Sequence, residues 1–235
     1  MSVLTSRLSS KAIISRAATD LGLDESQVKV GPSTTGIKRN ARFFYPASYP
    51  ATQAAEGVYL EMGTRGGTLP GLQVRPETSY ISQFLLSSGQ AGTFEEEQPV
   101  KAVLLDPVRT LFEKLSALHT AAIDAEAGDS SSMARAGRHY CDVQALLASE
   151  GLIERLSDLS IEDLMADIAD VSTRNGWAFH PRPEAGFASS LAFARDGRAV
   201  NQGRVSYEAA LGLIYSKPPT FEACLATIGM ASAHL

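Results

Sequence analysis

The second half of the chain opens with the sequence DPVRTLFEKLSALH at residues 106–119. Asp106 is a residue type that caps helix N-termini, and Pro107 stands at the first helical position, where its missing amide hydrogen costs nothing. The apolar residues that follow recur at helical spacing and share one face. They are Val108, Leu111, Leu115, Leu118 and Ala122. The spacing predicts a helix whose apolar face is buried in a protein core.

Further helices are predicted downstream, so residues 106–235 are expected to form a helical lobe. The segment RHYCDVQALLASE at residues 138–150 places Tyr140, Val143 and Leu147 on one face, together with the preceding Ala136. Another helix is predicted to begin at Ser160, with Asp163 three residues later as in a capping box. Two more are predicted over residues 206–215 and 220–233, and residues 128–136 are predicted to form a short exposed loop.

Residues 1–105 differ from the second half in the length of their apolar runs and are expected to form a separate α/β lobe. A helix is predicted over residues 5–21, after which apolar runs become short and turn residues frequent. The runs QVKV, ARFFYP, GVYLEM, LQVRP and VKAVLL occupy residues 27–30, 41–46, 57–62, 72–76 and 100–105. They predict one sheet with turns, and the glycine-rich segment 63–71, which lacks the ending of a P-loop, is predicted to be a hairpin turn. The fold class is α+β.

Composition limits the classes of function. Of the 235 residues 44% are hydrophobic and 20% charged, which is ordinary for a soluble protein. No apolar run approaches the roughly eighteen residues of a membrane span, and residues 1–20 lack a signal-peptide pattern, so a cytoplasmic protein without a membrane partner is expected. Cys141 and Cys224 form no metal-binding spacing and are expected to be small buried hydrophobes. The net charge of -5 argues against broad nucleic-acid binding but is compatible with a local basic cleft.

The first two predicted helices after residue 105 carry residues that are candidates for a chemical role. Lys114 falls at the flank of its apolar stripe, and Asp142 flanks the buried face of the next predicted helix, within reach of Arg138 and His139. If the helices pack side by side, the lysine and the aspartate face a common groove. Glu61, in the strand GVYLEM, projects away from the aliphatic face of that strand. A lysine that neutralises phosphate oxygens and carboxylates that hold Mg²⁺ suit phosphoryl chemistry.

Each of these residues also has a simpler interpretation. Lys114 fits a solvated lysine at a helix flank, and Arg138 with Asp142 fits a surface ion pair worth about 0.3–0.5 kcal/mol. Glu61 fits an exposed carboxylate on an edge strand. His119 lies at the edge of the apolar stripe and is interpreted as a core or boundary histidine.

The helical motifs match a known family. DPVRTLFEKLSALH, followed after a loop by ARAGRHYCDVQALL at residues 134–147, resembles the paired motifs of the AbiEii/AbiGii nucleotidyltransferase toxins. In that family a P-x-R-T-L-x-E-K helix precedes an R-H-x-x-D helix. The upstream stretch GVYLEMGTRGGTLPG is similar to the family's strand with an acidic residue, which is followed by arginine, glycine and proline. The resemblance covers residues 42–147.

The resemblance implies a truncated polymerase-beta-like nucleotidyltransferase sheet followed by a C-terminal helical lobe, with nucleotide bound between them. Lys114 matches the lysine that contacts nucleotide phosphates, and Asp142 matches an aspartate needed for activity. Arg138 and His139 of the same motif, with Arg65, are expected to bind nucleotide, and Glu61 is expected to complete a metal site. The implied reaction transfers a nucleotide from a nucleoside triphosphate to an acceptor, tRNA in some members, with Mg²⁺. The implied partner is the cognate antitoxin of a type IV toxin–antitoxin system.

One part of the family pattern is missing from the sequence. Family members have a G-G/S-T-x-L segment and a D-x-D pair, and no equivalent precedes Arg42. A misplaced start codon, a truncated gene or an upstream chain that supplies the strand pair would each explain this, and in the first two cases the chain as given is expected not to catalyse transfer. The chief alternative is a noncatalytic protein of the same fold that binds nucleotide, RNA or antitoxin. A structural helical adaptor is a second alternative.

Overall fold

The structure is a computed structural model that describes residues 10–32, 38–46, 57–63, 67–92, 94–214 and 217–235. Its contacts divide the chain into two compact units, residues 1–66 and residues 67–235, which are described one at a time. Small antiparallel sheets lie in the N-terminal part and helices dominate the C-terminal part, as the predicted α+β class requires. The division into lobes at residue 105 stays a prediction.

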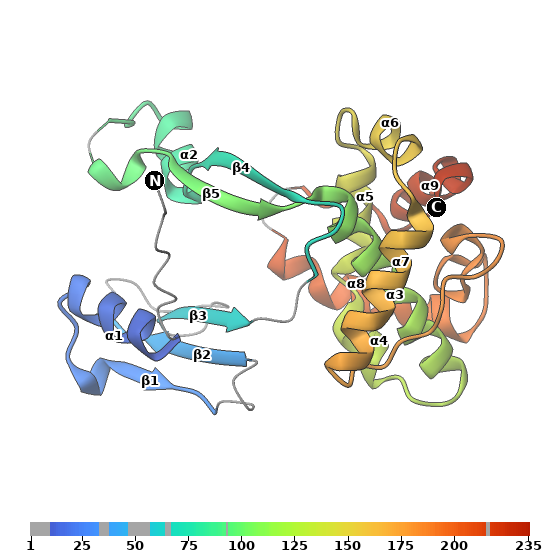
Figure 1. Ribbon diagram of the computed structural model, residues 1–235, viewed down its shortest axis with the longest axis horizontal. Coiled ribbons are helices and arrows are strands. Elements are labelled where there is room, and N and C mark those ends of the chain that lie inside the picture. Colours follow the sequence, from blue (N-terminus) through green and yellow to red (C-terminus); the bar gives the residue numbers. More distant parts are fainter. Residues whose placement is uncertain (1–9, 33–37, 47–56, 64–66, 93, 215–216) are drawn as a thin grey trace. The chain divides into compact units, whose positions relative to one another are not determined.

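The N-terminal unit is a three-stranded sheet with a helix on one face. Its elements are α1 (Ser10–Asp20), β1 (Val28–Val30), β2 (Lys38–Phe43) and β3 (Val58–Gly63), and the antiparallel strands lie in the order β1-β2-β3 (Figure 1). Ala41 and Phe43 of β2 are buried against Ile14 of α1, with Leu60 and Met62 of β3 partly buried beside them. Because side chains alternate along a strand, the same β3 directs Glu61 to the other face.

The second unit opens with two paired strands, β4 (Leu72–Glu77) and β5 (Val100–Leu105), joined through the helix α2 (Tyr80–Ser87). All five predicted strands are therefore present, but they form two sheets and not one. β3 pairs with β2 while β4 pairs with β5, so the predicted hairpin over residues 63–71 is wrong. The sequence pattern identifies strands but not their partners, and α2 was not predicted.

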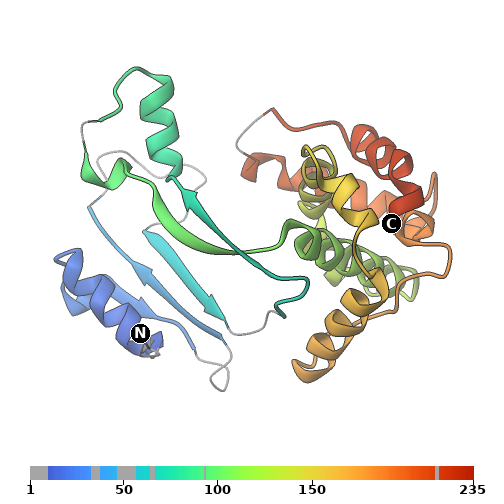
Figure 2. The same ribbon diagram turned by 45° about the horizontal axis from the view of Figure 1, so that its top comes forward.

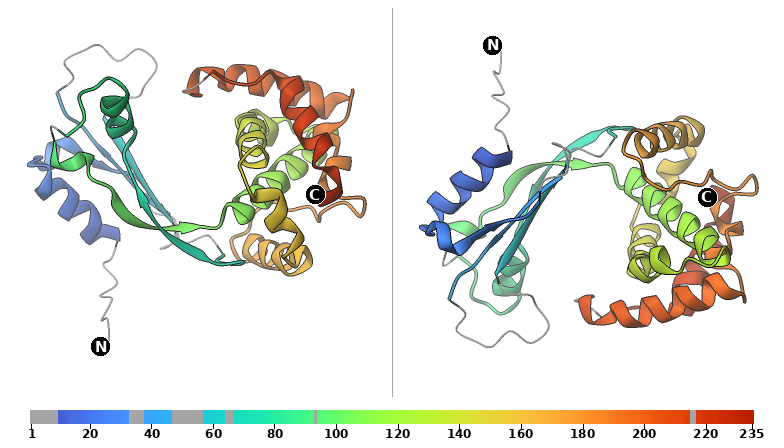
Figure 3. Two further views of the ribbon diagram at one scale, coloured as in Figure 1. Left: turned by 90° about the horizontal axis from the view of Figure 1, so that it is seen from above. Right: turned by 90° about the horizontal axis from the view of Figure 1, so that it is seen from below.

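Seven helices of the described chain follow β5 and pack around one of them. They are α3 (Pro107–Glu126), α4 (Ser131–Ala136), α5 (His139–Leu147), α6 (Leu152–Ser157), α7 (Ile161–Arg174), α8 (Arg198–Ala210) and α9 (Phe221–Met230). Helix α3 lies in the middle, with α7 on one side and α8 on the other (Figures 2 and 3). Twelve of its 20 residues are buried, including the whole predicted stripe, so α3 is the core of the unit. Short 3-10 turns occupy Glu25–Gln27, Glu95–Glu97, Phe187–Ser189, Leu191–Phe193, Leu211–Leu213 and Ser232–His234.

The N-terminus of α3 is fixed as the sequence predicts. The Asp106 carboxylate accepts a hydrogen bond from the Val108 amide at 2.9 Å, which satisfies one of the free donors of the first turn. The same carboxylate accepts from Gln73 of β4 at 2.9 Å and pairs with Arg155 of α6. One capping residue therefore ties the strand pair and a neighbouring helix to the start of α3.

Several other predictions can be compared with the described helices. Ser160 caps α7 by accepting from the Asp163 amide at 3.2 Å, and α9 begins directly after its cap Thr220, both as predicted. The predicted loop at residues 128–136 is wrong over its last six residues, because α4 covers 131–136 and buries Met133. Six residues are too few to show a helical period in sequence. The helix predicted over 206–215 begins earlier, at Arg198, and α6 was not predicted.

Two smaller predictions concern buried side chains. His119 is 7% exposed, and its Nδ1 lies 2.8 Å from the Ser190 hydroxyl, which confirms it as a core histidine. Burial lowers its pKa. Cys224 is buried as predicted, whereas Cys141 is only half-buried, and both are free thiols.

None of the described helices is both long and apolar enough to cross a membrane.

Candidate active site

Three polar side chains from α3 and α5 meet in the second unit, residues 67–235, which we call the helical unit. The Lys114 ammonium lies 3.0 Å from Oδ2 of Asp142 and 3.0 Å from Nδ1 of His139, and that Nδ1 lies 3.1 Å from the same Oδ2. The structure therefore brings together a lysine, a histidine and an aspartate that the sequence analysis singled out. We call these three residues the Lys114 cluster.

Helix packing explains why the three side chains meet. Helix α3 packs against α5, and α5 buries Tyr140, Val143 and Leu147 on one face. His139 and Asp142 are one turn apart on α5, so both point to the flank where Lys114 emerges from α3. Asp142 also lies in the first turn of α5, where the helix dipole favours a negative charge.

The proton positions in the cluster follow from the donors available. A single proton on Nδ1 of His139 serves only one neighbour, and donation to Asp142 lets this carboxylate accept from both the imidazole and the Lys114 ammonium. The ammonium carries three hydrogens, so two remain for other acceptors. Asp142 thus fixes the position of Lys114 without using up its capacity to bind an anion.

The cluster is partly open to solvent, with 25% of the Lys114 side chain and 40% of the Asp142 side chain exposed. Together with Arg138, Cys141 and Ile214, Lys114 and Asp142 line a pocket of about 410 Å³. Two cationic groups and one carboxylate give this pocket a net positive charge, which suits a phosphate group. The alternative of an Arg138–Asp142 ion pair is wrong for the described structure, because Asp142 pairs with Lys114 and His139.

The surroundings of Asp142 stabilise its charged form. Burial alone raises the pKa of this carboxyl group, but hydrogen bonds from His139 and Lys114, with their charges, outweigh burial and lower the pKa to about 2. Asp142 is therefore a carboxylate at neutral pH and serves as an acceptor, not as a proton donor.

This lowered pKa predicts how Asp142 contributes to stability. A group whose pKa is lower in the folded state stabilises the fold above its unfolded pKa, 3.8, and loses that contribution as pH falls toward about 2. The difference in unfolding free energy between wild type and Asp142→Asn should thus be larger at pH 6 than at pH 2.5, as measured by urea unfolding. Asp158→Asn, at an exposed position, is the control. An equal difference for Asp142→Asn at both pH values would contradict the assignment.

The other two predicted site residues, Glu61 and Arg65, belong to residues 1–66 of the sequence. Glu61 is exposed on β3 of the N-terminal unit, on the face opposite to Leu60 and Met62. Arg65 lies outside the described residues. Among the described residues no group of three His, Cys, Asp or Glu side chains could hold a metal ion. The roles of Glu61 as metal ligand and of Arg65 as nucleotide ligand stay predictions.

A buried arginine on α3 was not predicted from the sequence. The Arg109 side chain is 0% exposed and donates to Glu113 Oε1 at 2.7 Å, to Asp167 Oδ2 at 2.5 Å and to the Leu69 carbonyl at 3.1 Å. A Cβ atom at Gly67 would collide with Arg109 and Asp167, so the close approach of the chain requires glycine there. Arg109 therefore joins α3, α7 and the segment before β4. It is part of the motif P-x-R-T-L-x-E-K, the one signal in the sequence that could have identified it.

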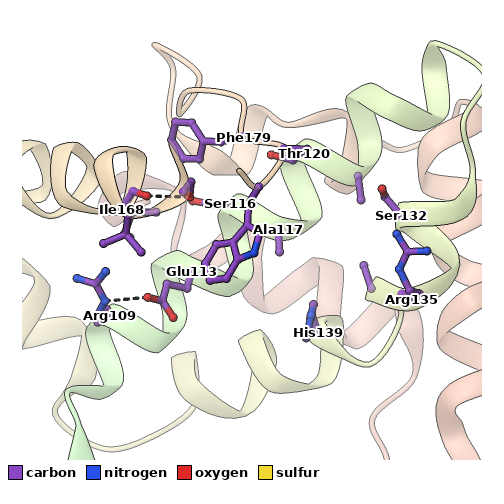
Figure 4. Close-up of a pocket in the computed structure, with 16 residues that line it drawn as sticks. Arg109, Glu113, Ser116, Ala117, Thr120, Ser132, Arg135, His139, Ile168 and Phe179 are labelled. Carbon is purple, nitrogen blue, oxygen red and sulfur yellow. Dashed lines mark hydrogen bonds and ion pairs between the residues drawn. The ribbon is translucent and has the colours of Figure 1, made fainter. Parts of the chain in front are cut away.

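A second pocket, of about 330 Å³, lies beside the Lys114 cluster (Figure 4). Glu113 and Arg109 lie on one side of it and Ser132 and Arg135 on the other. His139 belongs to both sites, because its ring lines this pocket while its Nδ1 contacts Lys114 and Asp142. No sequence pattern indicates this pocket, whose walls come from α3, α4, α5, α7 and the segment 177–179.

Comparison with known proteins gives one match. The family model described as "Nucleotidyl transferase AbiEii toxin, Type IV TA system" matches residues 5–227. This match extends on both sides of the segment 42–147 that carries the motifs. Neither the curated proteins nor the solved structures gave a match.

Proposed function

Because the chain belongs to the AbiEii nucleotidyl transferase toxin family of type IV toxin–antitoxin systems, we propose that it transfers a nucleotide from a nucleoside triphosphate to an RNA acceptor, tRNA being the first candidate. We place the phosphates of the triphosphate in the pocket lined by Lys114, Arg138 and Asp142. The observation that carries this proposal is the Lys114 ammonium, held 3.0 Å from Asp142 in a pocket of net positive charge.

The proposed reaction exchanges one oxygen for another at the α-phosphorus. A hydroxyl oxygen of the acceptor forms a bond to the α-phosphorus, the bond from this phosphorus to the bridging oxygen breaks, and pyrophosphate leaves. The hydroxyl proton passes to a base. Negative charge builds up on the phosphate oxygens, and the Lys114 ammonium stabilises it with the two hydrogens that Asp142 does not use. Asp142, which also accepts from His139, holds the ammonium in place, and Arg138 adds a second cation.

Other features belong to the same proposal. The polymerase-beta-like character of the sheet, Mg²⁺ as the cofactor, Glu61 as a catalytic and metal-binding residue and Arg65 as a nucleotide ligand are proposed from the family resemblance. The described residues offer no group of three His, Cys, Asp or Glu side chains that could hold this ion. A cognate antitoxin is the expected partner, as the family belongs to toxin–antitoxin systems. A cytoplasmic location stays a prediction.

Transfer of a radioactive label tests the proposal directly. The full chain is incubated with Mg²⁺, total tRNA and each of the four nucleoside triphosphates labelled at the α-phosphate, and the RNA is separated on a denaturing gel. We expect at least one triphosphate to label RNA, and we expect EDTA to abolish the label. Binding of triphosphate or tRNA without incorporation of any label would overturn the proposal in favour of a noncatalytic binding protein. Binding of neither would favour the structural adaptor.

A further inference from the structure

The pocket beside the Lys114 cluster has walls that suit a flat ring. Trp177 and Phe179 supply aromatic surface, while Ala117, Ile168 and Val171 supply small or aliphatic surface. Trp177 is 42% exposed and forms part of the pocket wall. A cavity of about 330 Å³ is at the small end of the range for ligand sites. We call it the Glu113 pocket.

The polar groups of the Glu113 pocket determine which edge of a bound ring would fit. The Glu113 side chain is 37% exposed, and its contact with Arg109 uses Oε1. Oε2 has no hydrogen-bond partner within the described part of the chain and is available to accept from a ligand. A carboxylate at this position favours a ligand edge that carries N–H donors, as an exocyclic amino group does.

Charge at this end of the pocket argues against a phosphate group. The buried Arg109 guanidinium pairs with two carboxylates, those of Glu113 and Asp167, so the three groups together carry one negative charge. A phosphate beside them would be repelled, whereas a neutral ring with amino hydrogens would be attracted. Arg135 lies on the opposite side of the same pocket, away from Glu113, and the cationic Lys114 and Arg138 lie in the neighbouring pocket.

We propose that the Glu113 pocket binds a nucleobase that carries an exocyclic amino group, which stacks on Trp177 and donates to Glu113. This inference rests on the proposed function, since His139 joins the pocket to the site proposed for the phosphates. The base belongs either to the nucleoside triphosphate or to an RNA nucleotide. Both share the same ring chemistry, and single-stranded RNA bases commonly stack on aromatic side chains.

The chain itself provides a specific probe, because Trp177 is its one tryptophan. Its fluorescence, excited at a wavelength selective for tryptophan and corrected for absorption with free tryptophan, is followed while ligands are added to the full chain. We expect cytidine monophosphate to quench it with a Kd about tenfold lower than uridine monophosphate, which lacks the amino group. Adenosine and guanosine monophosphates should also quench, and inorganic tripolyphosphate should not. Quenching by tripolyphosphate alone, or equal quenching by the cytidine and uridine nucleotides, would overturn the proposal.

A variant that fills the pocket makes the test local. Ala117 is exposed and lines the pocket, so Ala117→Phe blocks the ring site without entering the core. Ala134→Phe places the same ring at an exposed alanine of α4 outside this pocket and is the matched control. We expect the Kd of the quenching nucleotide to rise at least about tenfold in Ala117→Phe and to be unchanged in Ala134→Phe. Equal affinities in the two variants would contradict the assignment.

Two competition experiments distinguish a base of the triphosphate from a base of RNA. Comparing tryptophan quenching with label transfer distinguishes this inference from the proposed function. If nucleoside triphosphates compete with the quenching monophosphate and short single-stranded RNA does not, the base is that of the triphosphate; the reverse result assigns it to RNA. Quenching that Ala117→Phe removes would support the pocket even if no label were transferred. Label transfer with quenching unchanged in Ala117→Phe would overturn the pocket and leave the proposed function standing.

Discussion

Replacing Arg109 by methionine is expected to lower the unfolding free energy of the helical unit by about 3 kcal/mol. The guanidinium is fully buried and makes hydrogen bonds to Glu113, Asp167 and the Leu69 carbonyl. Methionine fills much of the volume but leaves the Leu69 carbonyl without this donor and two neighbouring carboxylates without their shared cation. Removing one partner of a buried charged network costs more than the net value of the network, because the other partners lose their compensation.

Urea unfolding followed by circular dichroism measures this effect. Arg174→Met is the matched control, since Arg174 forms an exposed ion pair with Asp170 near the C-terminus of α7. An exposed pair of this kind contributes between about 0 and 1 kcal/mol. A loss in Arg109→Met no larger than in Arg174→Met would show that the buried arginine is not a structural anchor. Gly67→Ala should also destabilise the unit, because its methyl group would collide with Arg109 and Asp167.

Replacing Lys114 by methionine is expected to reduce nucleotide transfer on the order of 100-fold with little loss of stability. The ammonium is the cation that Asp142 holds in the phosphate pocket, and a thioether cannot stabilise charge on phosphate oxygens. The half-exposed ion pair itself contributes about 1 kcal/mol or less to folding. Initial rates of label transfer measure the loss, and circular dichroism verifies the fold.

Lys101→Met is the control for this variant, because Lys101 is an exposed lysine of β5 in the same unit. Its transfer rate should equal that of wild type. A Lys114→Met variant that is as active as Lys101→Met would remove the lysine from the proposed reaction. Tripolyphosphate binding by calorimetry gives a second readout, since weaker binding is expected in Lys114→Met alone.

The helical core was the part of the fold that the sequence predicted best. Asp106, Pro107 and the stripe from Val108 to Ala122 specify α3 through local chemistry, namely a cap, a first-turn proline and a spacing of three and four residues. The strands were also predicted within a few residues, because their apolar runs are short and bounded by turns. Their division into two sheets depends on pairing between distant segments, which no local pattern contains.

The Lys114 cluster was predictable in part for the same reason. Flank positions on two adjacent helices follow from helical periodicity, so the meeting of Lys114 with Asp142 could be anticipated, although the participation of His139 in both contacts could not. Arg109 was missed because a helical wheel assigns polar residues opposite the leucine stripe to solvent. In α3 that side is covered by α7, whose Asp167 receives the guanidinium. The sequence of α3 alone does not show which helix covers that side, because this depends on tertiary packing.

The most direct test of the account is the rate of label transfer to RNA by wild type and Asp142→Asn, measured side by side. Asparagine keeps the size of the side chain but removes the charge that positions Lys114. The account predicts transfer by the wild-type chain and a rate on the order of 100-fold lower in the variant. Equal rates, or no transfer by either protein, would contradict it.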